Sequence, residues 1–481
     1  MSNNVTNIPD TTAFGEAKVE SMTPITQISA QYGLLTNVLT TVDNASSGTT
    51  SIIDNKFTCD SGTAADGLSS ILTLRQLAYR SGQGAAARFT ALFDTPVANN
   101  TQAAGLITAE NSFAFGYAGT TFGIIHAYNG KDELQELTLT VAAGAENVVV
   151  VIDGTGYTVA LSGVGNVQGD AFEIAQSLNT QVPNYIFTSN DSKVIAQSVL
   201  PQPQGVFAYT STGTSVGSWV QIVAGETASQ DFYPQSLWNR DTFPDLDHQK
   251  GNVYQIQVQY LGFGDIDFFV ESKETGRFVL VHRIEFANSN TLPSVSNPTF
   301  RVGWLSTNSG NTTNVRVQGS SAAAFIEGIV KRDTPQRSAF HDQLAVTTTL
   351  TNILSLRNRI SFGGKVNRAE IFPELVSGSS QTNKSAFFVI ILNPTYAEPV
   401  NFEYIDEDNS IAETATDLVS VTGGQLIGAI TVVNGASQVV RFNQGDQATA
   451  IYPGTTLCVA AQMASGAAAD CQASATWQED L

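Results

Sequence analysis

The chain has 481 residues, enough for about three domains of ordinary size. Charged residues make up only 14% of it, against about a quarter in an average soluble protein, while hydrophobic residues reach an ordinary 42%. The 23 Lys and Arg against 43 Asp and Glu give a net charge of -20, and this field repels phosphate and anionic lipid. The composition therefore argues against nucleic acid and membrane surfaces as partners.

No targeting or membrane segment is expected in this sequence. Residues 1–18 lack a cationic start followed by an apolar core, so they do not form a secretory signal. The longest apolar runs, Val148–Ile152 and Phe387–Leu392, are far shorter than the ~20 residues of a membrane-spanning helix. The 3 cysteines are an odd number and lie far apart, which excludes a disulfide scaffold.

The first part of the chain predicts an arm followed by a sandwich. Residues 1–29 are polar without a sustained period, as in an extended arm. From residue 30 to 133, short apolar segments recur about every 8 to 12 residues between turn-forming clusters, which is typical of a β-sandwich. Arg88–Phe93 alternates as a strand, and Ser112–Ile125 predicts a hairpin that turns at Ala118-Gly119.

Residues 134–214 predict a different, α+β module. Three strand patterns precede a helical one at Asp170–Leu178, where apolar side chains recur at helical spacing. Asp170 is the expected N-cap, and Glu173 stands at the capping-box position. Because the strand texture of residues 30–133 resumes at 215–330, we expect this module to be inserted into the first sandwich.

The remainder predicts a linker and a second sandwich. Residues 331–338 are polar, charged and contain a proline, as linkers do. Strand patterns then continue from residue 339 to 481. The predicted fold is therefore mainly β, with two antiparallel sandwiches of a lectin-like or jelly-roll-like kind, the first interrupted by the module.

Two groups of segments resemble motifs in structural proteins of tailed phages and large DNA viruses. The first group comprises Gly82-Gln83-Gly84, Arg88–Phe93, Gln102, Gly105 and Phe113–Gly123. The second comprises Gly251–Gly264, Val281-His282-Arg283 and Phe286-Ala287-Asn288. The pattern of strands is also similar to that of concanavalin-like lectin and glucanase sandwiches. Val149–Leu161, with the helix that follows, resembles small modules inserted in phage tail and fibre proteins. The resemblance covers residues 30 to about 330 and implies a component of a virus particle.

Asp265 and Asp267 are the strongest catalytic candidates, because glucanases of the lectin-like sandwich carry acidic residues at alternate positions of one strand. Such positions lie about 6.6 to 6.8 Å apart, near the ~5 to 5.5 Å between the carboxyl groups of retaining glycosidases. The sequence departs from that family, since Asp replaces the nucleophilic Glu and Glu271 follows Asp267 at a longer spacing. We therefore expect no enzyme, with glycoside hydrolysis as an alternative.

Two acidic loops carry oxygen ligands of the kind that calcium prefers. Asp241, Asp245 and Asp247 lie in the first loop, and Asp406 and Asp408 lie in the second. Neither loop contains the rest of a known calcium pattern, so solvated acidic loops are the expectation and calcium is the alternative. No other cofactor is expected.

Aromatic side chains beside Asn, Asp and Gln are the usual elements of a carbohydrate site, although aromatics on alternating strands more often belong to a core. The candidates for stacking on a sugar are Tyr79, Tyr117, Tyr128, Trp238 and Trp304.

The predicted function is assembly into a virus particle, as a capsid-associated, fibre or vertex protein that also attaches to a host surface. The low charge favours this prediction, because the centres of protein interfaces are depleted in Lys, Glu and Asp. The expected partners are further copies of the chain, with a trimer as one candidate, other virion proteins, and cell-surface glycans. A free carbohydrate-binding lectin is the main alternative.

Overall fold

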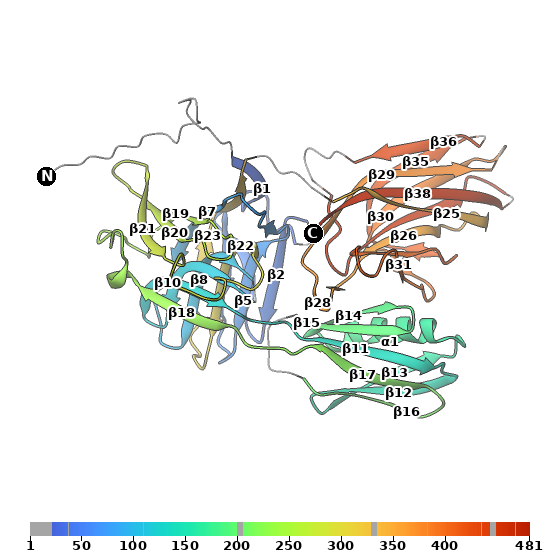
Figure 1. Cartoon of the computed structure of the whole chain (residues 1–481), viewed down its shortest axis with the longest axis horizontal. Coiled ribbons are helices and arrows are strands. Elements are labelled where there is room, and N and C mark those ends of the chain that lie inside the picture. Colours follow the sequence, from blue (N-terminus) through green and yellow to red (C-terminus); the bar gives the residue numbers. More distant parts are fainter. Residues whose placement is uncertain are drawn as a thin grey trace. The chain divides into compact units, whose positions relative to one another are not determined.

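The computed structural model describes residues 22–36, 38–108, 110–199, 205–328, 334–381, 383–433, 435–442, 449–466 and 468–481. Strands make up 56% of the structure and helix 4%, in multiple antiparallel sheets, which confirms the mainly β prediction. The chain divides into two compact units (Figure 1). Unit 1 contains the described residues up to Asn129 and those from Ala228 to the linker; unit 2 contains Gly130–Thr227 and the residues after the linker.

Unit 1 is a sandwich of two large sheets. The first has the order β21-β20-β19-β7-β23-β4-β3, with β24 beside β7 and β1 beside β24. Its strands are β1 Met22–Ser29, β3 Thr49–Ile53, β4 Lys56–Asp60, β7 Ala85–Phe93, β19 Asn252–Val258, β20 Ile266–Glu271, β21 Phe278–Ile284, β23 Arg316–Gly319 and β24 Ser321–Glu327. The second has the order β18-β10-β9-β8-β22-β5-β2, with β6 beside β22. Its strands are β2 Thr40–Ala45, β5 Leu68–Thr73, β6 Leu77–Ala78, β8 Asn100–Ile107, β9 Ser112–Ala118, β10 Thr121–Tyr128, β18 Ser229–Pro234 and β22 Thr299–Asn308.

The core of unit 1 lies between these sheets and is rich in aromatic rings. In β7, alternate side chains such as Phe89 and Phe93 are buried, as the sequence pattern predicts. Tyr254 of β19 stacks on Phe89 at a ring distance of 5.8 Å, and Phe115 of β9 lies 4.6 Å from Tyr254. Residues from both sheets thus share one interior.

The start of unit 1 differs from the expected arm. Residues 22–29 form β1, which pairs antiparallel with β24 from Met22–Glu327 to Ser29–Ser321. The boundary at residue 29 is therefore wrong for this segment, because its backbone is part of the sheet. Residues 1–21 of the expected arm and residues 331–333 of the expected linker lie outside the described residues.

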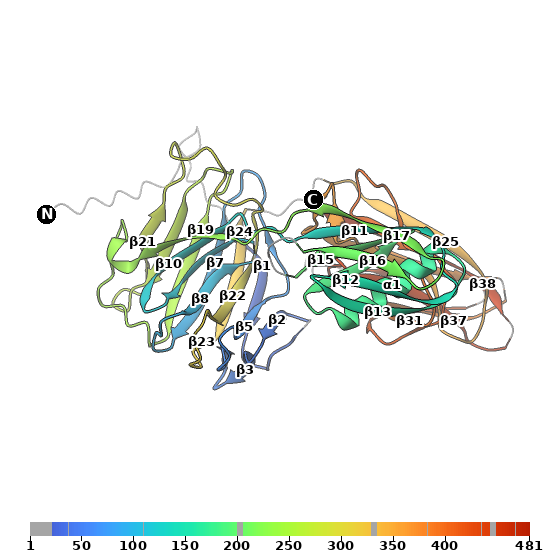
Figure 2. The same cartoon turned by 90° about the horizontal axis from the view of Figure 1, so that it is seen from below.

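The module in unit 2 consists of two small sheets and a helix (Figure 2). One sheet has the order β14-β15-β11-β17 and the other β13-β12-β16. The elements are β11 Leu134–Val141, β12 Ala145–Ile152, β13 Thr155–Ser162, α1 Val167–Gln181, β14 Tyr185–Asn190, β15 Lys193–Ser198, β16 Phe207–Ser211 and β17 Val216–Val223. The module therefore extends past residue 214, because β17 pairs with β11.

Helix α1 begins earlier than its apolar pattern indicates. Asn166 is the N-cap, and its side chain accepts a hydrogen bond from the Gly169 amide at 2.6 Å. Asp170, the expected N-cap, lies in the first turn with its side chain buried, where it accepts a hydrogen bond from the Ala143 amide at 2.6 Å. Burial raises the pKa of Asp170. The periodic pattern starts only at the first buried apolar residue, one turn after the true cap.

We predict that Asn166→Ala lowers the free energy of unfolding of unit 2 by about 1 kcal/mol, because it leaves the Gly169 amide without its cap. Chemical denaturation followed by circular dichroism measures this change. Asn166→Ser is the matched variant and should recover most of the loss. An equal loss in both variants would contradict the capping role.

The remainder of unit 2 is the second sandwich. Its sheets have the orders β25-β38-β29-β36 and β32-β33-β26-β37-β30-β35, and two short ladders pair β27 with β28 and β31 with β34. The strands are β25 Arg337–Val346, β26 Thr351–Asn358, β27 Ser361–Phe362, β28 Lys365–Val366, β29 Glu370–Ser380, β30 Ala386–Leu392, β31 Thr395–Tyr396, β32 Glu403–Tyr404, β33 Ala412–Ala415, β34 Val421–Thr422, β35 Gln425–Val432, β36 Ser437–Arg441, β37 Thr456–Met463 and β38 Ala469–Asp480. Phe388 and Trp477 are fully buried in its core.

The module packs on the second sandwich, although its sequence interrupts the first. Leu134 and Ile195 of the module share an apolar cluster with Ile360. Next to it, Arg357 forms an ion pair with Glu413 at 2.6 Å, and both side chains are buried. Glu413 also accepts a hydrogen bond from the Asn190 side chain of the module at 2.9 Å. Unit 2 is thus built from two segments that are separate in sequence.

In the described part of the chain, no helix combines the length and the apolar character needed to cross a bilayer.

Candidate functional site

A pocket of about 540 Å³ opens on unit 1 beside the β9–β10 hairpin, and its volume is typical of a site for a small ligand. It is referred to below as the Tyr117 pocket. Its lining residues are Tyr117, Thr120, Thr121, Phe122, Pro234, Gln235, Ser236, Thr242, Pro244 and His248. None of these is an Asp, Glu, Lys or Arg.

The hairpin and one loop position the pocket. Tyr117 is the penultimate residue of β9 and the cross-strand partner of Phe122 in β10, so both rings lie on the same face. Gly119 in the turn has φ 61°, a conformation that favours glycine. The short 3₁₀ helix η1 (Gln235–Leu237) follows β18 and brings Gln235 to the other wall.

Three rings meet at the floor of the pocket. The imidazole of His248 stacks on Phe122 at a ring distance of 3.7 Å and an interplanar angle of 25°. The Tyr117 ring stands edge-on to Phe122, with ring centroids 5.1 Å apart. Tyr117 and Phe122 are buried, so they belong to the pocket and the core at once. The floor therefore has a fixed shape, and His248 is the one of its three rings that is partly exposed.

Hydrogen bonds determine which ring nitrogen of His248 carries the proton. Gln235 donates from Nε2 to the carbonyls of Thr242 and Phe243, at 2.9 and 3.1 Å, which leaves its Oε1 as an acceptor. Nε2 of His248 lies 3.0 Å from this oxygen and therefore donates, while Nδ1 lies 3.1 Å from the Tyr117 hydroxyl and accepts. Burial lowers the pKa of His248 to about 4, although Asp247 acts in the opposite direction. The ring is neutral at pH 7.

The rim of the pocket carries free hydroxyl groups. Thr120, Thr121, Ser236 and Thr242 are exposed. Within the described residues, none of these four side chains has a hydrogen-bond partner. The pocket therefore combines an aromatic floor with a ring of uncharged donors and acceptors.

Of the five aromatic candidates, only Tyr117 lines this pocket. Trp304 is fully buried, stacks on Phe57 and donates from Nε1 to the Thr90 carbonyl at 2.8 Å, so it is not available to a sugar. Trp238 is buried as well and packs edge-on against Phe115 behind the floor. Neither indole lines the Tyr117 pocket, because both side chains lie inside the core.

The other two tyrosines serve structural contacts. The Tyr79 hydroxyl accepts hydrogen bonds from the amides of Gly82 and Leu261, each at 3.2 Å. Tyr128 lies against the buried ring of His126, with centroids 4.8 Å apart. Neither tyrosine lines the Tyr117 pocket.

The two catalytic candidates are tied to one arginine. Arg283 of β21 donates to both oxygens of Asp267, from Nε at 2.5 Å and from an Nη at 2.7 Å. This pairing raises the pKa of Arg283. Asp265 lies just before β20, where it accepts a hydrogen bond from the Phe286 amide at 3.0 Å. The bidentate pair occupies the acceptor oxygens that a nucleophile or general base would need free.

The first acidic loop does not gather its carboxylates. Asp241 accepts a hydrogen bond from the Phe243 amide at 2.8 Å, and Asp247 pairs with Lys250 at 2.9 Å. The Lys250 hydrogen bond lowers the pKa of Asp247. Asp245 is exposed. Across the described ranges, no three His, Cys, Asp or Glu side chains form a group that could hold a metal ion.

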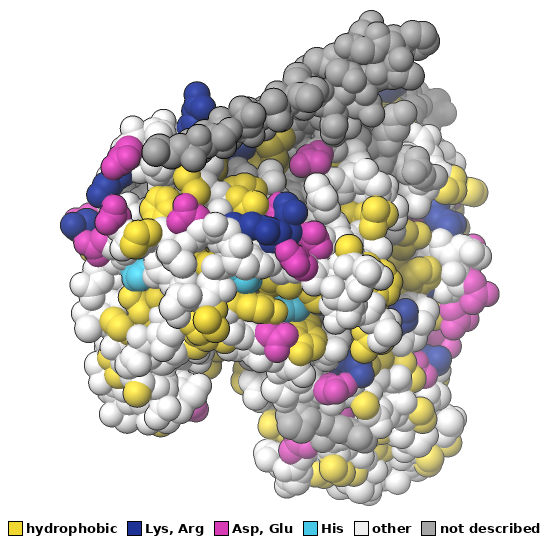
Figure 3. Space-filling view, turned by 60° about the vertical axis from the view of Figure 1, so that its left-hand side comes forward, with side chains coloured by type: hydrophobic (Ala, Val, Ile, Leu, Met, Phe, Trp, Pro, Cys, Tyr) yellow, Lys and Arg dark blue, Asp and Glu magenta, His cyan; other side chains and the backbone are white. Residues whose placement is uncertain are grey.

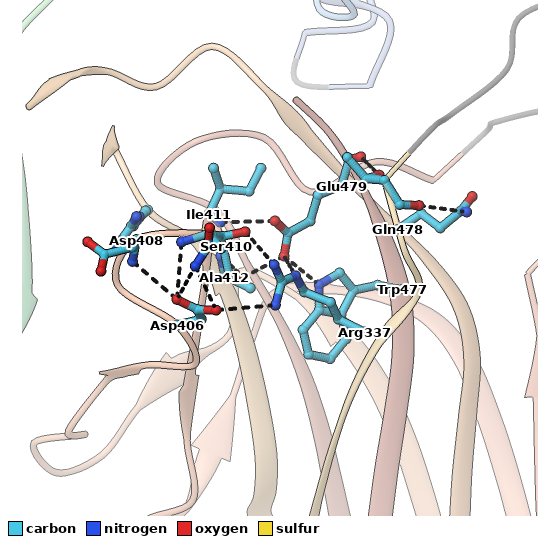
Figure 4. A network of polar contacts seen from close by, with 12 residues as sticks. Arg337, Asp406, Asp408, Ser410, Ile411, Ala412, Trp477, Gln478 and Glu479 are labelled. Atoms are coloured by element: carbon cyan, nitrogen blue, oxygen red, sulfur yellow. Dashed lines mark hydrogen bonds and ion pairs between the residues drawn. The ribbon is translucent and has the colours of Figure 1, made fainter. Parts of the chain in front are cut away.

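The second acidic loop belongs to a network in the second sandwich (Figure 4). Asp406 accepts hydrogen bonds from the amides of Asp408 and Asn409, at 3.2 and 3.1 Å. Arg337 lies between Asp406 and the buried Glu479, 3.9 and 3.5 Å away. Glu479 in turn accepts from Ser410, the Ile411 amide and Trp477. The loop is therefore closed by its own hydrogen bonds, with Arg337 supplying the cation.

Sequence reasoning missed His248 as a pocket residue because it stands alone in an acidic loop, without a periodic pattern.

The surface drawn in Figure 3 fits the low charge of the chain, since hydrophobic and uncharged side chains cover most of it and acidic and basic ones form scattered groups.

No family model matches the chain, and no curated protein matches it significantly. Among solved structures, a β-1,3-glucanase from Mycobacterium marinum has 8% identity and a TM-score of 0.26, with 63% of this chain and 98% of that chain covered. Lectin II from Ulex europaeus has 9% identity and a TM-score of 0.23, with 64% of this chain and 100% of that chain covered. Similarities this weak carry no argument about function.

Proposed function

We propose that the chain is a structural component of a virus particle, and that unit 1 attaches to neutral cell-surface glycans through the Tyr117 pocket. The observation that carries the glycan part is the pairing of a three-ring floor with a rim of free hydroxyl groups. A pyranose ring has one apolar C–H face and a ring of hydroxyl groups, which is the complement of this arrangement. A few polar groups at an aromatic wall are the usual basis of such recognition.

The charge of the site favours neutral glycans over acidic ones. No lining residue carries a charge at pH 7, since the His248 ring is neutral with its pKa lowered to about 4 by burial. The net charge of -20 also repels anionic ligands such as sialylated glycans at long range. Uncharged hexose units are therefore the proposed ligands.

The virion part of the proposal is supported by the glycine- and aromatic-rich motifs of residues 82–123 and 251–288, which resemble those of viral structural proteins. The low fraction of charged residues, 14%, supports it as well, because interface centres are poor in charge. A free lectin would use the same pocket, so self-association is the property that separates the two alternatives.

Glycan binding can be tested with the full chain on an array of neutral and sialylated glycans. We expect binding to neutral hexose-terminated glycans only. Ser236→Trp, placed on the exposed rim, should block the pocket without disturbing the floor and weaken binding on the order of tenfold or more. Thr313→Trp is the matched control, since Thr313 is exposed in the same unit but does not line the pocket.

Absence of binding to every neutral glycan would refute the glycan proposal. Equal loss in Ser236→Trp and Thr313→Trp would place any binding elsewhere on the protein. Unchanged circular dichroism of both variants ensures that the comparison concerns the pocket rather than folding.

A further inference from the structure

The sheet β25-β38-β29-β36 covers the core of the second sandwich with one face and leaves the other face to solvent. Val376 and Trp477 point inward and are fully buried. On the opposite face, Phe340 and Leu344 of β25 are 84% and 60% exposed, and Val439 of β36 is 52% exposed. This solvent side is called the outer face below. Exposed apolar side chains that gather on one face, rather than single ones, mark contact sites.

The strand register places these residues in one row across the sheet. Phe340 pairs with Ser474, Ser474 pairs with Ser377, and Ser377 pairs with Val439. The two serine hydroxyls in the middle are 2.7 Å apart and bond to each other. The row is therefore apolar and protruding at both edges of the sheet, and small and flat in the centre.

We infer that the outer face is the contact surface for a second copy of this chain. A twofold axis parallel to the strands reverses the strand order across the contact, so β25 lies over β36 of the partner. Phe340 then packs on the partner's Val439, and the symmetry repeats this contact at the other edge. The same row thus supplies both the protruding ring and its apolar counterpart.

The neighbouring rows are compatible with this packing. One row contains Ser338, Thr476, Leu375 and Arg441, and the other contains Asp342, Gln472, Ser379 and Ser437. The same axis places Arg441 against the partner's Ser338 and Asp342 against the partner's Ser437. No like charges meet in these two rows. Contacts between like charges would oppose association.

The area of the outer face suits a reversible dimer. Four strands of these lengths, at ~4.8 Å spacing and ~3.3 Å per residue, cover about 600 Å². A standard stable interface takes about 800 Å² from each partner, so this contact lies at the lower end of that range. We expect association that depends on concentration.

Light scattering of the full chain over a dilution series tests this contact. Wild type should approach twice the chain mass of 51.1 kDa at high concentration. Phe340→Ser should weaken self-association on the order of tenfold, because it removes both symmetry-related anchors. Phe387→Ser is the matched control: Phe387 is 40% exposed on β30 of the opposite sheet, and its removal should leave the dimer intact.

Cross-linking tests the orientation. Facing sheets lie about 10 Å apart, too far for a disulfide but within reach of a short bis-maleimide. Because these changes remove contact side chains, cross-linking is carried out at the highest concentration of the dilution series. Phe340→Cys with Val439→Cys should then cross-link into a dimer, whereas each single variant should not, and the native cysteines are buried. A wild type that stays monomeric at all concentrations, a dimer unaffected by Phe340→Ser, or cross-linking of Phe340→Cys alone would overturn the inference.

Discussion

Unit 1 is expected to lose stability steeply as the pH falls from about 6.5 to 4. Burial lowers the pKa of His248 and of His282 to about 4, and it lowers the pKa of His126 as well. The unfolded chain binds protons at these histidines near pH 6.5, while the folded chain leaves them neutral. Because the unfolded state then binds more protons, the free energy of unfolding decreases as the pH falls through this window.

The size of the effect follows from the shift. A difference of about 2.5 pKa units corresponds to about 3 kcal/mol per histidine, and partial solvent access reduces this to about 2 kcal/mol. The charged neighbours of the two histidines have opposite effects on their pKa values. Asp247 raises the pKa of His248, and Arg240 lowers the pKa of His282. For His126, Asp231 favours the proton, and burial outweighs it.

Urea denaturation of the full chain at several pH values, followed by tryptophan fluorescence, measures this dependence, and the histidine variant below assigns it to unit 1. Stability should be flat from pH 7 to 8 and should fall below pH 6.5. His248→Gln should reduce the decrease in the free energy of unfolding by the contribution of one histidine. The Gln amide can keep a hydrogen bond, and it does not titrate. A wild-type profile that stays flat down to pH 4 would show that protonation of these rings costs nothing in the folded state.

Removing one partner of the buried Arg357–Glu413 pair should destabilise unit 2 far more than removing one partner of an exposed ion pair. Glu413→Leu leaves the Arg357 guanidinium buried without its carboxylate, where it also lies 3.8 Å from the Phe402 ring. We expect a loss of about 3 to 5 kcal/mol in the free energy of unfolding. The double change to Leu at both positions should recover much of it, since a buried pair replaced by apolar side chains leaves no unpaired charge.

The exposed pair Lys131–Glu226 is the control for this experiment. Its side chains are 52% and 57% exposed at a distance of 2.6 Å, so Glu226→Leu should change stability by less than about 1 kcal/mol. Calorimetry or denaturant titration of the wild type, Glu413→Leu, Arg357→Leu and the double variant gives the coupling energy. A Glu413→Leu variant as stable as the Glu226→Leu variant would contradict a buried, unscreened ion pair.

Local patterns predicted the strands and the β9–β10 hairpin well, because the alternation of Arg88–Phe93 and Ser112–Ile125 reports which side chains face the core. They placed the start of α1 one turn late, since the cap Asn166 precedes the first apolar residue of the periodic pattern. Alternation also could not separate a core indole from a ligand-binding one, as Trp304 shows.

Longer-range features were beyond prediction. The packing of the module on the second sandwich depends on contacts such as Asn190–Glu413, 223 residues apart, which leave no trace in local periodicity. The Tyr117 pocket likewise needs a histidine from a distant loop to stack on Phe122. Of the five aromatic candidates, only Tyr117 lines the pocket, so the sequence predicted one residue of it.

The docking of the module on a later part of the chain has a consequence for synthesis. At about 5 to 20 residues per second, a ribosome needs roughly 10 to 45 seconds to add the 223 residues that separate Asn190 from Glu413. During that time Ile195 and its neighbours in the nascent module lack the surface that later covers them. A chaperone that shields this patch, or a codon usage that shortens the wait, would raise the yield of correctly assembled chains.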